Sequence, residues 1–160
     1  MNNEQPIRRI HVSNALFMQE IRRMFNDEGR KSVTFTVRGF SMRPFLENGR
    51  DKVVITPPQK PQIGQVVLAE YAPKRYALHR IIAIDGNKII MQGDGNRLSQ
   101  TETFPAEKLI GTAVAFIRKG KRVNTDSKRW LRYSKFWMRC RRMRSTLLLI
   151  YRIKYKIFKS

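Results

Sequence analysis

Short runs of mostly apolar residues recur through the middle of the chain, separated by polar and turn residues. These runs lie at 33–37, 51–56, 66–71, 76–84, 88–92 and 109–117. Runs of this length that are rich in β-branched residues predict strands. Asp85-Gly86-Asn87, between two of the runs, is typical of a hairpin turn. Short strands at this spacing predict a mainly β domain, rolled or barrel-like, over residues 33–123.

The residues before the first strand carry a helical pattern instead. Apolar side chains recur there at spacings of one, three and four: Phe17, Ile21, Met24 and Phe25. Ser13 or Asn14 can cap the start of such a helix, and Gly29 can end it. We therefore expect residues 1–32 to hold an amphipathic helix that covers the β domain. His11 precedes this helix, and we expect no catalytic role for it.

After about residue 124 the strand pattern stops, and basic and aromatic residues interleave. Apolar residues then recur by threes and fours, with Lys154 interrupting the series: Phe136, Cys140, Met143, Leu147, Ile150 and Ile157. This spacing predicts that residues 124–160 form a basic amphipathic helix or a pair of helices.

The charge of the chain is concentrated in this tail. The net charge is +21, with 17 Lys/Arg and 11 Asp/Glu in residues 1–117 but 16 Lys/Arg and one acid in residues 118–160. Such a segment attracts anionic lipid, nucleic acid or an acidic protein. Because cations here combine with Trp130, Trp137 and Tyr151, an anionic membrane surface is favoured over single-stranded nucleic acid as its partner.

Other features of the sequence bear on where in the cell the protein is located. The longest aliphatic run near the end, 147–151, is far shorter than the roughly 20 residues of a membrane span. The first 31 residues lack the apolar core of a signal peptide. The single Cys140 excludes an internal disulfide and a cysteine-based zinc site. We expect a cytoplasmic protein, peripheral at a membrane where its tail binds lipid, and no cofactor or metal.

Two short motifs carry candidate chemistry. Ser41, in Gly39-Phe40-Ser41-Met42-Arg43-Pro44, lies where the first strand gives way to a turn, which is a place where a serine can act as a nucleophile. His79 is one of two histidines, and histidine is largely neutral at pH 7 and able to accept the serine proton. Asp94, between two glycines, could orient the ring or could simply form a turn.

These motifs, in this order, resemble those of the signal peptidase family of serine proteases and of the related self-cleaving SOS repressors. The resemblance covers residues 33–122 and rests on five segments: the Ser41 motif, 48–55, 63–67, Leu78-His79-Arg80-Ile81-Ile82, and Gln92-Gly93-Asp94-Gly95-Asn96 with the closing strand at 110–114. A histidine at position 79, where bacterial leader peptidases have lysine, is similar to the endoplasmic-reticulum and archaeal branch.

The resemblance implies a signal-peptidase-like or SOS-repressor-like rolled β domain and a serine endopeptidase that cleaves leader or precursor peptides. It implies Ser41 as nucleophile, His79 as general base, the Ser41 backbone N–H as oxyanion donor, and small side chains before the cleaved bond. Gly39 stands where some members carry a hydroxyl donor, and Ser99-Gln100-Thr101-Glu102 where a second acid usually follows.

Two other classes of function remain open. The first is a catalytically inactive β module that binds membrane or nucleic acid through the tail. The second is a self-cleaving regulator, which is disfavoured because residues 1–32 are too few for both a DNA-binding domain and a cleavage site.

Overall fold

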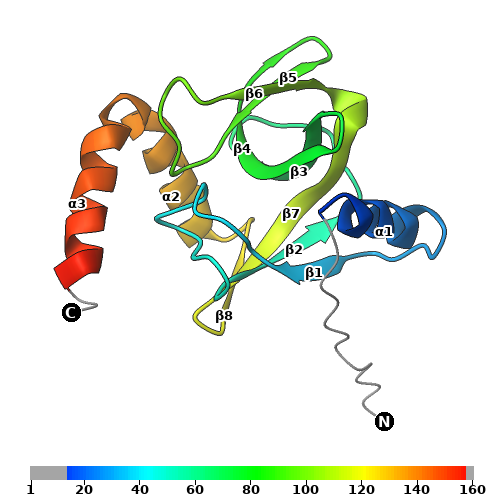
Figure 1. Cartoon of the computed structure of the whole chain (residues 1–160), viewed down its shortest axis with the longest axis horizontal. Helices are drawn as coiled ribbons and strands as arrows, with labels where there is room; N and C mark the ends of the chain where they lie inside the picture. Colours follow the sequence, from blue (N-terminus) through cyan, green and yellow to red (C-terminus); the bar gives the residue numbers. More distant parts are fainter. Residues whose placement is uncertain (1–13, 158–160) are drawn as a thin grey trace.

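The computed structural model describes residues 14–157, and Figure 1 shows a curled antiparallel sheet with helices at its two sides. The strands are β1 (Val33–Thr36), β2 (Lys52–Thr56), β3 (Val66–Ala72), β4 (Arg75–Asp85), β5 (Lys88–Gln92), β6 (Glu102–Pro105), β7 (Leu109–Arg118) and β8 (Lys121–Asn124). The helices are α1 (Asn14–Asn26), α2 (Lys128–Arg139) and α3 (Arg144–Ile157), with 3₁₀ turns η1 (Ala106–Lys108) and η2 (Cys140–Met143). The predicted mainly β class is confirmed.

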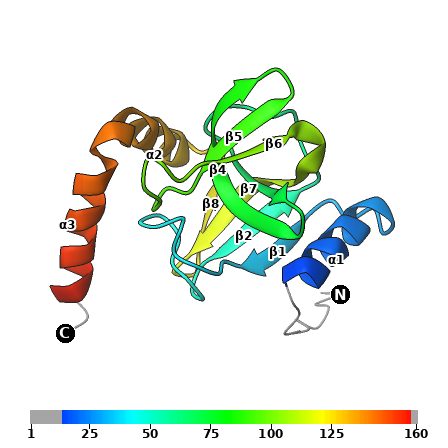
Figure 2. The same ribbon diagram turned by 45° about the horizontal axis from the view of Figure 1, so that its top comes forward.

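All strand pairs are antiparallel, in the order β1-β2-β7-β3-β4-β5-β6, and β8 adds to β7. Figure 2 shows this sheet bending into a half-barrel. All six predicted runs are strands, and the predicted hairpin joins β4 to β5. Sequence reasoning missed β6 and β8, which are only four residues long and carry little apolar pattern.

The curled sheet has a hydrophobic core on each face. In β3, Val66 and Leu68 belong to the larger core, while Val67 and Ala69 belong to the smaller one. Successive side chains of a strand point to opposite faces, so a strand that is apolar at every position fits a sheet buried on both sides. Neighbouring residues of the central strands therefore face different surroundings, which matters for the site below.

Helix α1 closes the larger core from one side. Met18, Ile21 and Phe25 are buried in that core, and the Phe17 ring meets Phe35 of β1 edge to face with 5.5 Å between centroids. The predicted amphipathic helix is thus confirmed. It ends before Gly29, which has a φ of +61°. Its predicted cap at Ser13 lies outside the described residues.

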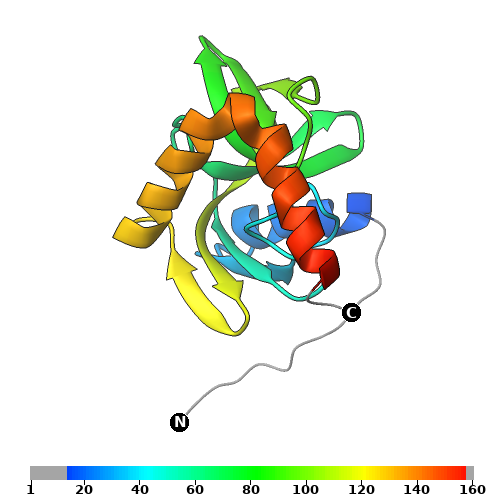
Figure 3. The ribbon, with the colours of Figure 1, turned by 90° about the vertical axis from the view of Figure 1, so that its left-hand side faces the viewer.

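The C-terminal helices lie at the other end of the sheet from α1, and Trp130 of α2 packs into the same larger core. Figure 3 shows α2 and α3 as the two arms of a V in front of the β domain. Helix α2 begins after Ser127, whose side-chain oxygen accepts the Trp130 N–H at 3.3 Å. Among residues 14–157, no helix is both long enough and apolar enough to cross a membrane.

The predicted tail is a pair of basic helices, but the face that packs differs from the predicted stripe. Met143 and Ile157, which belong to the stripe, are 62% and 66% exposed. The buried residues of the tail are instead Trp130, Ser134, Trp137, Arg144 and Leu148. Residues spaced by threes and fours share one face only along one continuous helix. The chain turns at η2, so apolar residues on the two helices do not share one inward face.

Candidate functional site

The Ser41 turn is fixed by backbone contacts directly after β1. Gly39 has a φ of +87°, which side chains disfavour, and its N–H donates to Asn48 Oδ1 at 2.9 Å. The Arg43 N–H donates to the Phe40 carbonyl at 3.1 Å, and Met42 is buried in the larger core. Ser41 is therefore held, half-buried, on a short and well-anchored segment.

His79 lies in the middle of β4 and is nearly buried. Its Nδ1 is 2.8 Å from Oε2 of Glu102, the first residue of β6. A carboxylate at this position holds the tautomer in which Nδ1–H donates and Nε2 carries the free lone pair. The ring is thus oriented with its basic nitrogen turned away from Glu102.

Gly93 lies between the serine turn and the histidine ring. A Cβ added to Gly93 would come within 2.5 Å of the Ser41 carbonyl oxygen and 2.9 Å of His79 Nε2. The next glycine, Gly95, donates its N–H to the same Ser41 carbonyl at 2.7 Å. The turn after β5 therefore joins the Ser41 segment to the His79 strand, and only glycine fits at position 93.

Ser41, His79 and Glu102 line one pocket of about 330 Å³. Its other walls come from α1, β1, β3 and β4 and are largely apolar and aromatic, including Phe17, Phe35, Tyr71, Tyr76 and Leu78. The two residues singled out from the sequence as nucleophile and base thus open onto the same space. This pocket is the candidate active site.

Asp94 does not take the predicted position against the histidine ring. Its two carboxylate oxygens accept from Arg80 Nε at 2.8 Å and Arg80 Nη2 at 2.7 Å. His79 and Arg80 are neighbours in a strand, so their side chains point to opposite faces. The turn that places Gly93 against His79 therefore places Asp94 against Arg80. The carboxylate that contacts the His79 ring is that of Glu102.

The Arg80–Asp94 pair is completely buried. Arg80 Nη1 also donates to the Gly64 carbonyl at 2.9 Å and to Ser134 Oγ, and the guanidinium lies 4.9 Å from the Trp130 ring centroid. Burial disfavours the charged guanidinium, but the charge and hydrogen bonds of Asp94 outweigh this and raise the pKa of Arg80. Arg80 is therefore a charged anchor for the turn beneath the site.

The C-terminal helices also reach the site. Arg144, the first residue of α3, donates from Nη1 to Gln92 Oε1 at 2.7 Å and to the Gly93 carbonyl at 3.1 Å. Further along α3, Tyr151 donates to Glu47, whose carboxylate also binds Arg43. Burial lowers the pKa of Arg144. The tail thus supports both the Gly93 turn and the Ser41 segment, a role that its charge pattern did not predict.

Residues 14–157 contain no group of three or more His, Cys, Asp or Glu side chains that could hold a metal ion. Comparison of the chain with models of known protein families and with curated proteins finds no match.

Proposed function

We propose that this protein is a serine endopeptidase of the signal-peptidase type, with Ser41 as nucleophile and His79 as general base. One observation carries the proposal: Ser41 and His79 line the same pocket while a carboxylate holds the far side of the ring at 2.8 Å. A serine, a histidine and an orienting acid are the parts that nucleophilic catalysis by a hydroxyl requires.

In this mechanism His79 Nε2 accepts the proton of Ser41 Oγ as the oxygen attacks a peptide carbonyl. Glu102 stabilises the imidazolium that forms, because its ionised carboxylate accepts a hydrogen bond from Nδ1–H at 2.8 Å. The C–N bond then breaks, and Nε2–H gives its proton to the leaving amine. A water molecule then gives a proton to His79 Nε2 as its oxygen attacks the ester. The C–O bond to Ser41 breaks, Nε2–H returns the proton to Ser41 Oγ, and the acyl part leaves as a peptide with a new carboxyl end. The backbone N–H of Ser41 makes no hydrogen bond within residues 14–157, so it can donate to the oxyanion.

The arrangement of the motifs supports a signal-peptidase-like rolled domain as the finer fold. The serine motif follows edge strand β1, the histidine lies in β4, and the Gly-Asp turn follows β5. Ile110 to Val114, the closing segment of the resemblance, lies in β7 at the centre of the sheet. The substrate in this proposal is a leader or precursor peptide, with small side chains before the cleaved bond as the resemblance implies.

A serine-directed acylating probe tests the proposal. The probe is expected to form one adduct, which peptide mapping by mass spectrometry assigns to Ser41. The same probe is expected to leave no adduct on Ser41→Ala. An adduct on another residue, or no adduct on the wild type, would contradict the assignment.

We propose a second function, membrane attachment, on a separate observation. The side of α3 that faces away from the sheet, with the last residue of η2, carries exposed apolar residues, here called the outer face: Met143, Leu149, Ile150, Ile153 and Ile157. Arg152, Lys154 and Lys156 are exposed beside it. An apolar helix face with flanking cations suits the surface of an anionic bilayer, and a cytoplasmic protein that is peripheral at the membrane would use it in this way. The same tail without turnover would be the inactive binding module, and nucleic acid would be its weaker partner.

Vesicle flotation tests this attachment. Substituting Ile150 and Ile153 with serine is expected to weaken binding to anionic vesicles by about tenfold or more, because their burial in the interface is lost. Leu16→Ser on α1 is the matched control, since Leu16 is also exposed but lies on the other side of the domain. Equal flotation of all three proteins, or retention of the tail by single-stranded oligonucleotides alone, would exclude a lipid surface as the target.

A further inference from the structure

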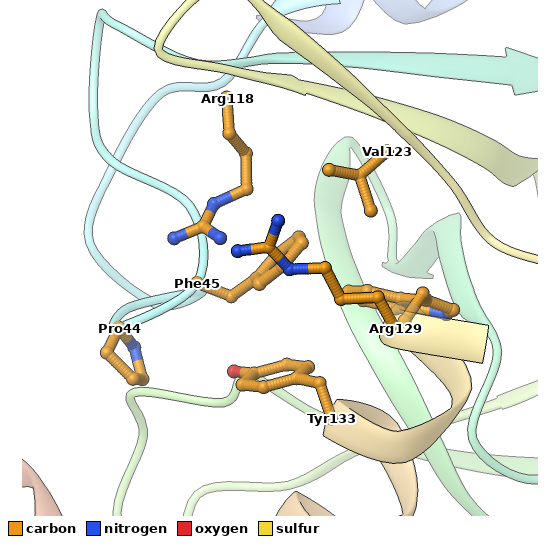
Figure 4. Close-up of a pocket in the computed structure, with 7 residues that line it drawn as sticks. Pro44, Phe45, Arg118, Val123, Arg129 and Tyr133 are labelled. Carbon is orange, nitrogen blue, oxygen red and sulfur yellow. The ribbon is translucent and has the colours of Figure 1, made fainter. Parts of the chain in front are cut away.

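A second pocket of about 330 Å³ lies behind the serine turn and shares no lining residue with the Ser41 pocket. Its residues come from four places in the chain, and Figure 4 draws all of them as sticks: Pro44, Phe45, Arg118, Val123, Arg129, Trp130 and Tyr133. Three aromatic rings and two guanidinium groups thus meet in one space, and the pocket contains no carboxylate.

Arg118, the last residue of β7, is partly buried there without a matching acid. Its guanidinium carbon lies 4.1 Å from the Phe45 ring centroid, and its Nε is buried without a hydrogen-bond partner within residues 14–157. Burial lowers the pKa of Arg118. Asp51 attracts it from a distance, but both oxygens of that carboxylate already bind Arg50 and the backbone N–H groups of Glu47 and Lys119.

Arg129 brings a second unpaired cation to the same pocket. It is exposed, and its side chain makes no hydrogen bond or ion pair in the described part of the chain. Figure 4 shows its guanidinium beside that of Arg118, and its charge opposes protonation of Arg118. Arg129 also lies in the first turn of α2, which contains no acidic residue. The positive end of the helix dipole therefore adds to the positive electrostatic potential of the two guanidinium groups.

We propose that this pocket binds a phosphate group. Two guanidinium forks that converge without a carboxylate repel each other, and an oxyanion between them removes the repulsion and gains charge-assisted hydrogen bonds. A tetrahedral dianion can accept from both forks at once, as well as favouring a helix N-terminus. The rings of Phe45, Trp130 and Tyr133 leave an apolar wall for whatever the phosphate is attached to. The source is either a soluble phosphate ester or a phospholipid headgroup.

Titration calorimetry with inorganic phosphate and phenyl phosphate tests the soluble source. Co-sedimentation with phosphatidylcholine vesicles, with and without phosphatidic acid, tests the lipid source. The variants are Arg118→Gln and Arg129→Gln. The control is Arg139→Gln, which removes the same charge from the far end of α2. Because Arg129 is exposed, its replacement is expected to leave folding unchanged, as circular dichroism can verify.

Each variant in the pocket is expected to weaken binding by about tenfold, while the control binds like the wild type. Loss of phenyl phosphate binding in both pocket variants would assign a soluble ester. The same loss confined to vesicles with phosphatidic acid would assign the headgroup. No binding by the wild type, or equal binding by all four proteins, would overturn the proposal.

Discussion

Ser41→Ala is expected to abolish peptide cleavage, with a fall in kcat on the order of 10⁶-fold, which is the scale seen when a serine protease loses its nucleophile. His79→Ala is expected to cost about as much, and the double variant little more, because the two side chains act in one step. Glu102→Gln is expected to cost on the order of 10⁴-fold, since the amide can hold the ring in the wrong tautomer. Rates with a fluorogenic leader peptide measure all four proteins.

One control variant and one spectroscopic measurement show whether these variants lose activity through the chemistry or through the fold. Ser32→Ala removes an exposed hydroxyl just before β1 and is expected to cleave like the wild type. Near-ultraviolet circular dichroism should be the same for every variant, which separates lost chemistry from lost structure. Unchanged cleavage by Ser41→Ala, or a double variant whose loss equals the product of the single losses, would remove the proposed pair.

Arg80→Met is expected to destabilise the fold strongly, because it leaves the carboxylate of Asp94 buried with only the Tyr133 hydroxyl, 3.4 Å away, to meet it. Removing one partner of a buried ion pair costs about 3–5 kcal/mol. For a chain of this size that corresponds to a fall in Tm of roughly 6–20 °C. Thermal unfolding followed by circular dichroism measures the change.

Replacing both partners separates the unpaired charge from the loss of packing. Arg80→Met with Asp94→Leu is expected to be more stable than Arg80→Met alone, since no isolated charge remains in the core. Arg23→Met breaks the exposed ion pairs of Arg23 with Glu20 and Glu28 and is expected to shift Tm very little. A Tm for Arg80→Met close to that of Arg23→Met would show that the buried pair does not anchor the Gly93 turn.

Much of the sheet could be predicted from the sequence because its strands are apolar runs closed by turn residues. Val66 to Ala69 illustrate this: four apolar residues in succession fit a strand that is buried on both faces. The serine turn could be predicted too, because Gly39 and Pro44 bracket Ser41 directly after such a run. These signals depend only on residues that are close together in the chain, so they can be read from a single sequence.

The acid of the candidate site could not be assigned in the same way. Glu102 and Asp94 lie on either side of a loop, and only the pairing of β5 with β6 brings Glu102 toward His79. The alternation of side chains along a strand could have shown this. His79 and Arg80 face opposite sides of β4, so a turn that places Gly93 against His79 places Asp94 against Arg80. The packing of α2 and α3 also depends on distant contacts, such as Ser134 with Arg80.

The contact between Arg144 and the Gly93 carbonyl has a consequence for how the protein is made. A ribosome releases the strands first, so Gly93 and Glu47 meet Arg144 and Tyr151 only when synthesis has passed both helices. The contacts that support the Gly93 turn and the Ser41 segment from α3 are therefore made last in a nascent chain. A chain cut short before Arg144 would keep α2 but lack α3, and its Gly93 turn would lose the hydrogen bonds from Arg144 to Gln92 and to the Gly93 carbonyl.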